Sequence, residues 1–157
     1  MATAIFAAGC FWGVEAAFME VEGVLATEVG YSGGNTPNPG YKEVCTGKTG
    51  HAEVVRLDFE AARIGFENLL EVFWNCHDPT TLNRQGADVG SQYRSAIFYM
   101  DDEQKELAER SKAAQGASGR LERPVVTAIV PAATFWRAED YHQDYFGKNP
   151  EAAVCHI

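Results

Sequence analysis

One cysteine of the chain lies where a thiol could act as a nucleophile. Cys10 follows the apolar run Thr3 to Ala8 and precedes a segment whose apolar residues recur at helical spacing. A strand is therefore expected to end, and a helix to begin, at this cysteine. The exposed N–H groups and the positive dipole end of a helix favour a thiolate over a thiol. Unpaired cysteines are also often small, inert core residues, so the placement alone leaves both interpretations open.

A carboxyl group on a predicted strand is the second candidate. The segment His51 to Phe59 alternates as a strand does, and Glu53 shares its apolar face with Val55 and Leu57. Burial on that face disfavours the carboxylate and raises its pKa, so that a neutral carboxyl can donate a proton. Glutamate is rarely buried, and the alternative that this side chain reaches solvent stays open on the residues alone.

Two long polar loops, predicted at 33–50 and 80–92, carry further polar side chains. Tyr41 lies in the first loop, Asp88 lies in the second, and Tyr93 directly follows the second. Loops of this length without regular structure are usually functional or disordered. A tyrosine hydroxyl can hold a substrate oxygen, and an aspartate can orient a substrate. Packing and turn formation are the alternative roles for these three residues.

The remaining cysteines give no sign of a metal site. The sequence contains no C-x-x-C pair and no two histidines three to five residues apart, so we predict no metal. Cys76 completes the apolar stripe of a helix that begins near Phe66, which favours a structural role. Cys45 lies in the first loop without a predicted base or helix terminus, and its role stays undecided. Cys155 lies near the end of the chain.

The composition bounds the class of protein. The chain has 157 residues, of which 46% are hydrophobic, enough for one domain with a core. Its net charge of −9 argues against nucleic acid and anionic membrane surfaces as partners. No apolar run approaches the roughly 18 residues of a membrane span. Because no Lys or Arg precedes Lys42, a signal peptide is not predicted, and we expect a cytoplasmic protein.

The order of predicted elements indicates the fold class. Strand, helix, strand, strand, helix and strand follow one another, and this order matches the split β-α-β pattern of ferredoxin-like α+β folds. An additional helix, Glu103 to Gln115, an additional strand, Val125 to Val130, and a long C-terminal coil complete the chain. We predict a single domain over residues 1–157, with a mobile tail from about 147 to 157.

A set of short motifs runs in order through nearly the whole chain. They are Gly9-Cys10-Phe11-Trp12-Gly13, Gly30-Tyr31-Ser32-Gly33-Gly34, Pro39-Gly40-Tyr41, Thr49-Gly50-His51-Ala52-Glu53-Val54-Val55, His77-Asp78-Pro79-Thr80, Asn83-Arg84-Gln85-Gly86 with Asp88 and Gly90, Gln92-Tyr93-Arg94-Ser95, and Ala138-Glu139-Asp140-Tyr141-His142-Gln143. In these motifs the chain resembles the A-type peptide methionine sulfoxide reductases, a class of enzymes that repair oxidised methionine.

The resemblance implies a reaction and a set of partners. It implies reduction of S-epimer methionine sulfoxide, free or in proteins, with Cys10 as nucleophile and Glu53 as the acid that protonates the oxygen. Cys10 then becomes a sulfenic acid and forms a disulfide with Cys155, which thioredoxin or dithiothreitol reduces. No cofactor is implied. Cys45 is the competing resolving cysteine, because its loop is expected to border the same pocket.

The resemblance also implies a substrate pocket. Phe11 and Trp12 form an apolar cage for the terminal methyl group, Tyr41 and Tyr93 lie around the sulfoxide oxygen, and Asp88 orients the substrate backbone.

Two other functions fit part of the sequence. A thiol peroxidase would use the same two cysteines, but would need no methyl cage and would consume peroxide at least as fast as sulfoxide. A binding module with inert cysteines would show slow alkylation of Cys10 that does not depend on pH around neutrality.

Overall fold

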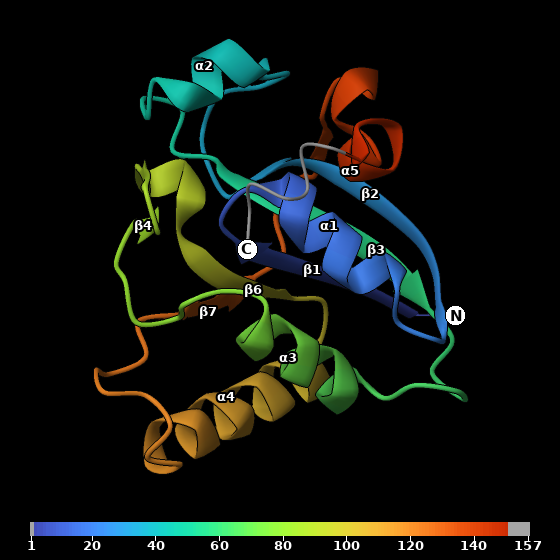
Figure 1. Ribbon diagram of the computed structural model, residues 1–157, viewed down its shortest axis with the longest axis vertical. Helices are drawn as coiled ribbons and strands as arrows, with labels where there is room; N and C mark the ends of the chain where they lie inside the picture. Colours follow the sequence, from blue (N-terminus) through green and yellow to red (C-terminus); the bar gives the residue numbers. More distant parts are fainter. Residues whose placement is uncertain (1, 151–157) are drawn as a thin grey trace.

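A six-stranded sheet organises the computed structural model, which describes residues 2–150 (Figure 1). Its strands are β1 (Ala2–Ala8), β2 (Val24–Ser32), β3 (Ala52–Phe59), β6 (Ser95–Tyr99), β7 (Ala128–Pro131) and β8 (Trp136–Arg137). They lie in the order β7-β6-β1-β3-β2-β8, and neighbours are antiparallel except for the parallel pair β6 and β7. A separate hairpin is formed by β4 (Arg84–Gln85) and β5 (Asp88–Val89).

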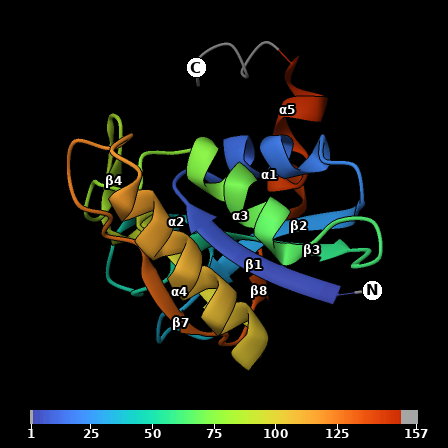
Figure 2. The ribbon, with the colours of Figure 1, turned by 90° about the horizontal axis from the view of Figure 1, so that it is seen from below.

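Three of the helices cover one face of the sheet. The helices are α1 (Phe11–Met19), α2 (Tyr41–Cys45), α3 (Phe66–Asn75), α4 (Asp102–Ala117) and α5 (Tyr145–Lys148), with short 3-10 turns η1 (Ser91–Tyr93) and η2 (Asp140–His142). Figure 2 shows α1 and α3 side by side over the sheet, with α4 beyond α3. The helix α2 lies inside a loop that was expected to be irregular. The segment expected as C-terminal coil contains β8, η2 and α5.

The sheet order confirms the predicted ferredoxin-like core. In the sheet β3 lies between β1 and β2, and β1 lies between β3 and β6. Each of the units β1-α1-β2 and β3-α3-β6 is therefore a β-α-β unit split by one inserted strand. The strands β7 and β8 extend the two edges of this four-stranded core.

Two element boundaries differ from the sequence prediction for physical reasons. The strand predicted at Val125–Val130 begins only at Ala128, because the Val126 N–H donates to the Pro79 carbonyl at 2.8 Å rather than to a neighbouring strand. The loop predicted at 80–92 extends past its predicted end, because η1 continues through Tyr93 and β6 begins only at Ser95.

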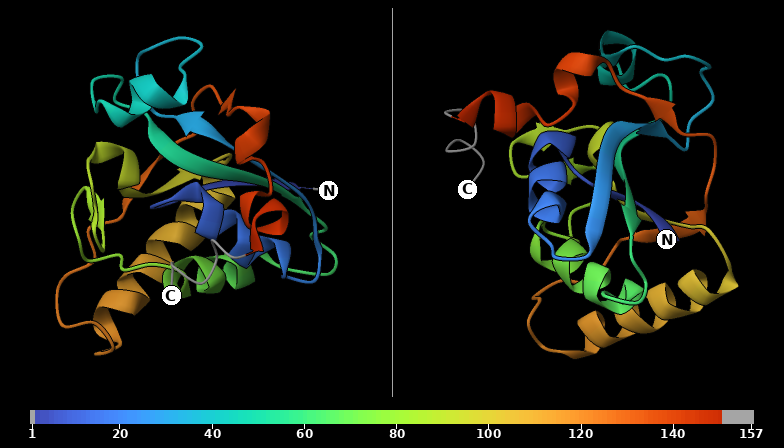
Figure 3. Two further views of the ribbon diagram at one scale, coloured as in Figure 1. Left: turned by 45° about the horizontal axis from the view of Figure 1, so that its top comes forward. Right: turned by 90° about the vertical axis from the view of Figure 1, so that its right-hand side faces the viewer.

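Aromatic packing fixes α1 against the sheet. The ring of Phe6, on β1, stacks on Phe18 of α1 at 5.2 Å between centroids and also contacts Phe66 and Phe73 of α3. The opposite face carries a smaller core covered by Phe135, from the segment after β7. Figure 3 shows this segment passing along that face and then crossing the sheet edge to reach α5 beside α1. The start of α1 is thus held over the end of β1, between α2 and the C-terminal segment.

Candidate active site

The thiol of Cys10 lies at the junction between β1 and α1, as predicted. Cys10 is the N-cap residue of α1. The preceding residue, Gly9, has a φ of 95°, and a Cβ there would lie 2.6 Å from Cγ of Gln85. A glycine is therefore required both for the left-handed backbone and for the close approach of β4.

The helix terminus favours a thiolate at Cys10, but other effects on the pKa of this thiol are larger. Backbone N–H groups of Trp12 and Gly13 do favour the charged sulfur. Burial of the sulfur outweighs them, and the nearby carboxyls of Glu53 and Asp88 act in the same direction as burial. Together these effects raise the pKa of Cys10 to about 12. Cys10 therefore rests as a protonated thiol at neutral pH.

The carboxyl of Glu53 is buried on the predicted apolar face of β3, with 1% of its surface exposed. Oε1 accepts the backbone N–H of Phe11 at 3.1 Å, while Oε2 is buried and has no hydrogen-bond partner among residues 2–150. Burial raises the pKa of Glu53 to about 8, the Phe11 N–H opposes this shift, and the charge of Asp88 adds to it. At pH 7 this carboxyl is mostly neutral and has a proton to donate.

The two predicted tyrosines interact electrostatically with Glu53. Burial is the main cause that raises the pKa of Tyr93, to about 12, and the charges of Glu53, Cys45, Asp88 and Cys10 contribute in that order. Tyr93, the last residue of η1, therefore interacts electrostatically with all four of these groups.

The hydroxyl of Tyr41 reaches the same site from α2. Burial and a side-chain hydrogen bond with Cys45 raise its pKa, and Glu53 adds to the shift. The Tyr41 backbone N–H donates to Oε2 of Glu139 at 3.0 Å.

Asp88 and Cys10 line a common cavity. The cavity measures about 460 Å³ and is also bordered by Cys76, His77 and Gly86. A substrate backbone could lie here between the nucleophile and the carboxylate. The structure thus brings together five predicted polar residues from α1, α2, β3, β5 and η1.

The two aromatic residues that follow Cys10 occupy different environments. Phe11 is 1% exposed, and its ring lies 5.7 Å from Tyr31 and 5.1 Å from His142. Trp12 is partly buried, stacks on Tyr145 at 3.8 Å and donates its indole N–H to Nδ1 of His142 at 2.9 Å. The ring of Phe11 is therefore part of the core beneath the site, whereas Trp12 lies at its border.

Three residues at the site had no assigned role from the sequence. The Tyr31 hydroxyl donates to Oε1 of Glu139 at 2.9 Å, and Tyr31 lies directly opposite Glu53 in the pairing of β2 with β3. His142 accepts the Trp12 indole N–H. All three lie within the motifs of the resemblance, which was the only available signal, because their partners are about a hundred positions away in sequence.

The other cysteines differ in placement. Cys76 ends α3, packs against the core and donates its thiol to the Phe73 carbonyl at 3.3 Å, in agreement with a structural role. Burial raises its pKa to about 12. Cys45 is exposed beside Tyr41. Cys155 lies outside the described residues.

No group of three or more His, Cys, Asp or Glu within residues 2–150 is arranged to hold a metal ion. None of the helices in that range is long and apolar enough to cross a membrane.

A cysteine at a helix N-terminus beside a neutral, buried carboxyl fits the class of thiol-dependent oxidoreductases. Residues 2–157 match the family model described as peptide methionine sulfoxide reductase. A relative from Acidobacterium capsulatum, named peptide methionine sulfoxide reductase MsrA, is 56% identical over 157 residues and covers 100% of both chains. The chain therefore belongs to the peptide methionine sulfoxide reductase family, A type, and is a methionine sulfoxide reductase.

Solved structures agree with this assignment. Reduced Mxr1 from Saccharomyces cerevisiae superposes with a TM-score of 0.88 at 36% identity, covering 99% of this chain and 91% of that one. Mxr1 in complex with Trx2 has a TM-score of 0.62 at 24% identity, covers 92% of this chain and 84% of that one, and shares the fold.

Proposed function

We propose that the enzyme reduces the S epimer of methionine sulfoxide through a sulfenic acid on Cys10, followed by a Cys10–Cys155 disulfide that thioredoxin reduces. The observation that carries the chemical step is the unpartnered Oε2 of Glu53. This oxygen is buried beside Cys10, has no hydrogen-bond partner within residues 2–150, and belongs to a carboxyl with a pKa of about 8.

The first step moves one oxygen and balances its protons. Cys10 attacks the sulfoxide sulfur while Glu53 gives its proton to the sulfoxide oxygen. The attack joins the two sulfurs in a short-lived intermediate, in which the sulfur–sulfur bond and the methionine sulfur–oxygen bond then break as the hydroxyl moves to the Cys10 sulfur. Methionine leaves with its sulfur reduced by two electrons, and Cys10, oxidised by two electrons, becomes a sulfenic acid. The partial positive charge of a polarised sulfoxide sulfur promotes loss of the Cys10 proton, which restores the proton of Glu53.

Selection of one epimer follows from three contacts of the chiral sulfur centre: polar donors at its oxygen, an apolar wall at its methyl group, and Cys10 at the sulfur itself. The oxygen points to Glu53, Tyr41 and Tyr93, which are electrostatically coupled in the structure. The methyl group lies against the wall made by Trp12, with Phe11 behind it. With Cys10 fixed below the sulfur, exchange of oxygen and methyl in the R epimer puts an apolar group at the polar donors.

The second step regenerates the enzyme. Cys155 condenses with the sulfenic acid of Cys10, a sulfur–sulfur bond forms and water leaves; a dithiol then reduces the disulfide. The structure of Mxr1 in complex with Trx2 supports thioredoxin as the reductant. Cys45, although exposed near the site, is hydrogen-bonded to Tyr41 and is not required in this scheme.

Turnover of separate epimers tests the overall proposal. With dithiothreitol as reductant, the S-sulfoxide of a methionine peptide should be reduced and the R-sulfoxide should not. Hydrogen peroxide is the third substrate, because a thiol peroxidase would consume it at least as fast. Equal turnover of both epimers, or faster turnover of peroxide, contradicts the proposal.

Replacement of Cys155 tests the resolving step separately. Cys155→Ser should release one methionine per enzyme in a burst and then stall with thioredoxin, leaving a sulfenic acid on Cys10 that mass spectrometry detects. The matched variant Cys45→Ser should cycle normally. Full thioredoxin-driven turnover of Cys155→Ser, or a Cys10–Cys45 disulfide in the oxidised wild type, assigns the resolving role elsewhere.

A further inference from the structure

We propose that His142 is a positioning residue that holds the Trp12 indole in place and thereby sets the preference of the enzyme for a methyl sulfoxide. The inference rests on the proposed function, in which Trp12 contacts the substrate methyl group. His142 itself reaches Trp12 and not the reacting atoms, and its role is to fix the shape of the pocket.

The hydrogen bond between the two rings defines the state of the histidine. The Trp12 Nε1–H donates to Nδ1 of His142 at 2.9 Å, so Nδ1 carries no proton and the proton of the neutral ring is on Nε2. His142 is 0% exposed, and Nε2 is buried without a partner among residues 2–150. Within residues 2–150, the Trp12 indole is the hydrogen-bond partner of this ring.

The indole is held from a second direction by the same segment. Tyr145 stacks on Trp12 with 3.8 Å between centroids and an interplanar angle of 8°. One face of the indole is thus covered and its N–H is engaged, both by residues of the C-terminal segment. These two contacts, rather than the substrate, fix the tilt and the rotation of the Trp12 indole.

The histidine also contacts the other aromatic residues of the site. Its ring lies 4.5 Å from Tyr41 and 5.1 Å from Phe11, centroid to centroid. His142 therefore lies between the residue proposed to bind the sulfoxide oxygen and the residues proposed to border the methyl group. A change at His142 alters their spacing.

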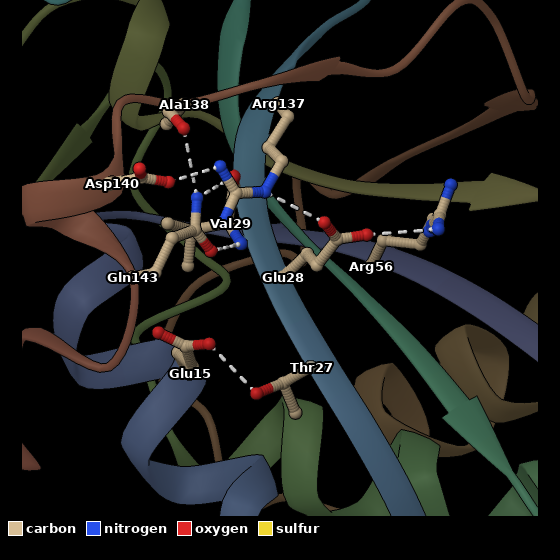
Figure 4. Close-up of polar contacts among 9 residues, drawn as sticks. All are labelled: Glu15, Thr27, Glu28, Val29, Arg56, Arg137, Ala138, Asp140 and Gln143. Atoms are coloured by element: carbon tan, nitrogen blue, oxygen red, sulfur yellow. Dashed lines mark hydrogen bonds and ion pairs between the residues drawn. The ribbon is translucent and has the colours of Figure 1, made fainter.

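The residue that follows His142 anchors it to the sheet. The Gln143 side chain accepts the Val29 N–H at 2.9 Å, and its amide donates to the carbonyls of Val29 at 2.9 Å and Ala138 at 3.0 Å (Figure 4). This places the histidine on a rigid element, because two hydrogen bonds tie the adjacent residue to Val29 of β2 and a third ties it to Ala138. A positioning role needs such support.

A second anchor lies one residue further along the chain. The Asp144 N–H donates to Oε1 of Glu15 at 2.7 Å, and the hydroxyl of Thr27 donates to Oε2 at 2.8 Å. Figure 4 shows Glu15 and Thr27 facing each other between α1 and β2. The segment that carries His142 is thereby joined to α1, the helix that carries Trp12.

Paired substitutions at His142 separate the hydrogen bond from the packing. His142→Phe keeps an aromatic ring but removes the acceptor, whereas His142→Asn keeps an acceptor near the Nδ1 position and removes most of the ring. The substrates are the S-sulfoxides of a methionine peptide and of its S-ethyl homologue. One methylene in an apolar pocket is commonly discriminated by roughly 10–200-fold in kcat/KM.

His142→Phe should raise KM for the methyl sulfoxide and lower the methyl-to-ethyl ratio of kcat/KM by about tenfold. Single-turnover release of methionine at saturating substrate should stay within about twofold of wild type, because Cys10 and Glu53 are unchanged. His142→Asn should keep a methyl-to-ethyl ratio of kcat/KM close to that of wild type. An unchanged ratio in His142→Phe, or an equal fall in both variants, overturns the proposal.

Replacement of the donor, Trp12, tests the same hydrogen bond from its other side. Trp12→Phe should lower the methyl-to-ethyl ratio of kcat/KM as His142→Phe does. The ratio in the double variant should be no lower, because both substitutions remove the same hydrogen bond. Additive losses contradict the proposal. Failure of the underlying function is distinguishable, because the wild type itself would then reduce neither sulfoxide.

Discussion

Two glutamates, one on α1 and one beside it, are almost equally buried and differ in their hydrogen bonds. Glu53, on β3, is 1% exposed, and Glu15, on α1, is 2% exposed; burial is the first cause that raises the pKa of each. Both oxygens of Glu15 accept hydrogen bonds, from Thr27 and Asp144. Glu53 accepts one, from Phe11, and its other oxygen has no partner within the described range.

The difference shows that burial alone does not identify a proton donor. A carboxyl whose two oxygens both accept hydrogen bonds joins elements of the fold, as Glu15 joins α1 to β2 and to the C-terminal segment. A buried carboxyl with an unused oxygen beside a thiol retains capacity for a substrate. The comparison predicts that chemistry depends on Glu53 and that fold stability depends on Glu15.

The largest expected effect is on the chemical step. Glu53→Gln keeps the shape of the side chain and the acceptor for the Phe11 N–H, but it loses the transferable proton. General acid catalysis is typically worth about 10²–10⁴-fold, and we expect a loss in that range in single-turnover release of methionine. Glu15→Gln is the matched control and should stay within about twofold of wild type. Equal rates for Glu53→Gln and wild type from pH 5 to 9 would remove Glu53 from the mechanism.

The next effect concerns stability as a function of pH. Because burial raises the pKa of Glu53 from 4.5 to about 8, the folded state holds this proton more tightly than the unfolded state. Wild-type stability therefore falls as pH rises through this window, and a glutamine has no such dependence. The free energy of unfolding of Glu53→Gln should therefore rise relative to that of wild type between pH 5 and 9, by a few kcal/mol at pH 9. Urea unfolding at pH 5, 7 and 9 measures the difference; a constant difference contradicts the buried, raised pKa.

Glu15→Ala should destabilise the fold without affecting the reaction chemistry. It leaves the Asp144 N–H and the Thr27 hydroxyl without their acceptor, which typically costs about 1–3 kcal/mol. Glu15→Gln should lose less, because its amide oxygen can accept from Asp144 and its N–H can donate to Thr27. Thermal unfolding at pH 7 ranks the three proteins. If Glu15→Ala matches wild type in stability, Glu15 does not support the fold as its two hydrogen bonds indicate.

The sequence predicted one side of this comparison better than the other. The alternation of β3 was sufficient to place Glu53 on a buried face, and the order of elements was sufficient for the ferredoxin-like core. Glu15 could not be interpreted in this way, because its partner Asp144 is 129 positions away. The same limit applies to His142 and Trp12, which are 130 positions apart. Such pairs are determined by how the C-terminal segment crosses the sheet edge, which local periodicity does not encode.

The pKa of Cys10 shows a second limit. The helix N-terminus that favours a thiolate was visible in the sequence, and the structure confirms that terminus. The opposing effects, burial and the carboxyls of Glu53 and Asp88, come from elements far along the chain and are larger. A local signal was therefore correct in position and wrong in its net consequence.

The smallest expected effect is on substrate binding, at Tyr145, which connects the Glu15 contacts to Trp12. Asp144, held by Glu15, precedes Tyr145, whose ring stacks on Trp12. Tyr145→Leu keeps an apolar cover over the indole but removes aromatic stacking, which is worth about 0.5–1.5 kcal/mol beyond area burial. We expect a KM for the S-sulfoxide raised by about two- to tenfold, with single-turnover chemistry unchanged.

The comparison of Tyr145→Leu with Tyr145→Phe makes this prediction specific. Phenylalanine keeps the stacked ring and loses only the hydroxyl, so its KM should equal that of wild type if stacking on Trp12 is what matters. A rise in KM shared by both variants assigns the effect to the hydroxyl. A fall in single-turnover rate in Tyr145→Leu would mean that the Trp12 side of the site contributes to chemistry as well as to binding, and the separation between the two glutamate regions would not hold.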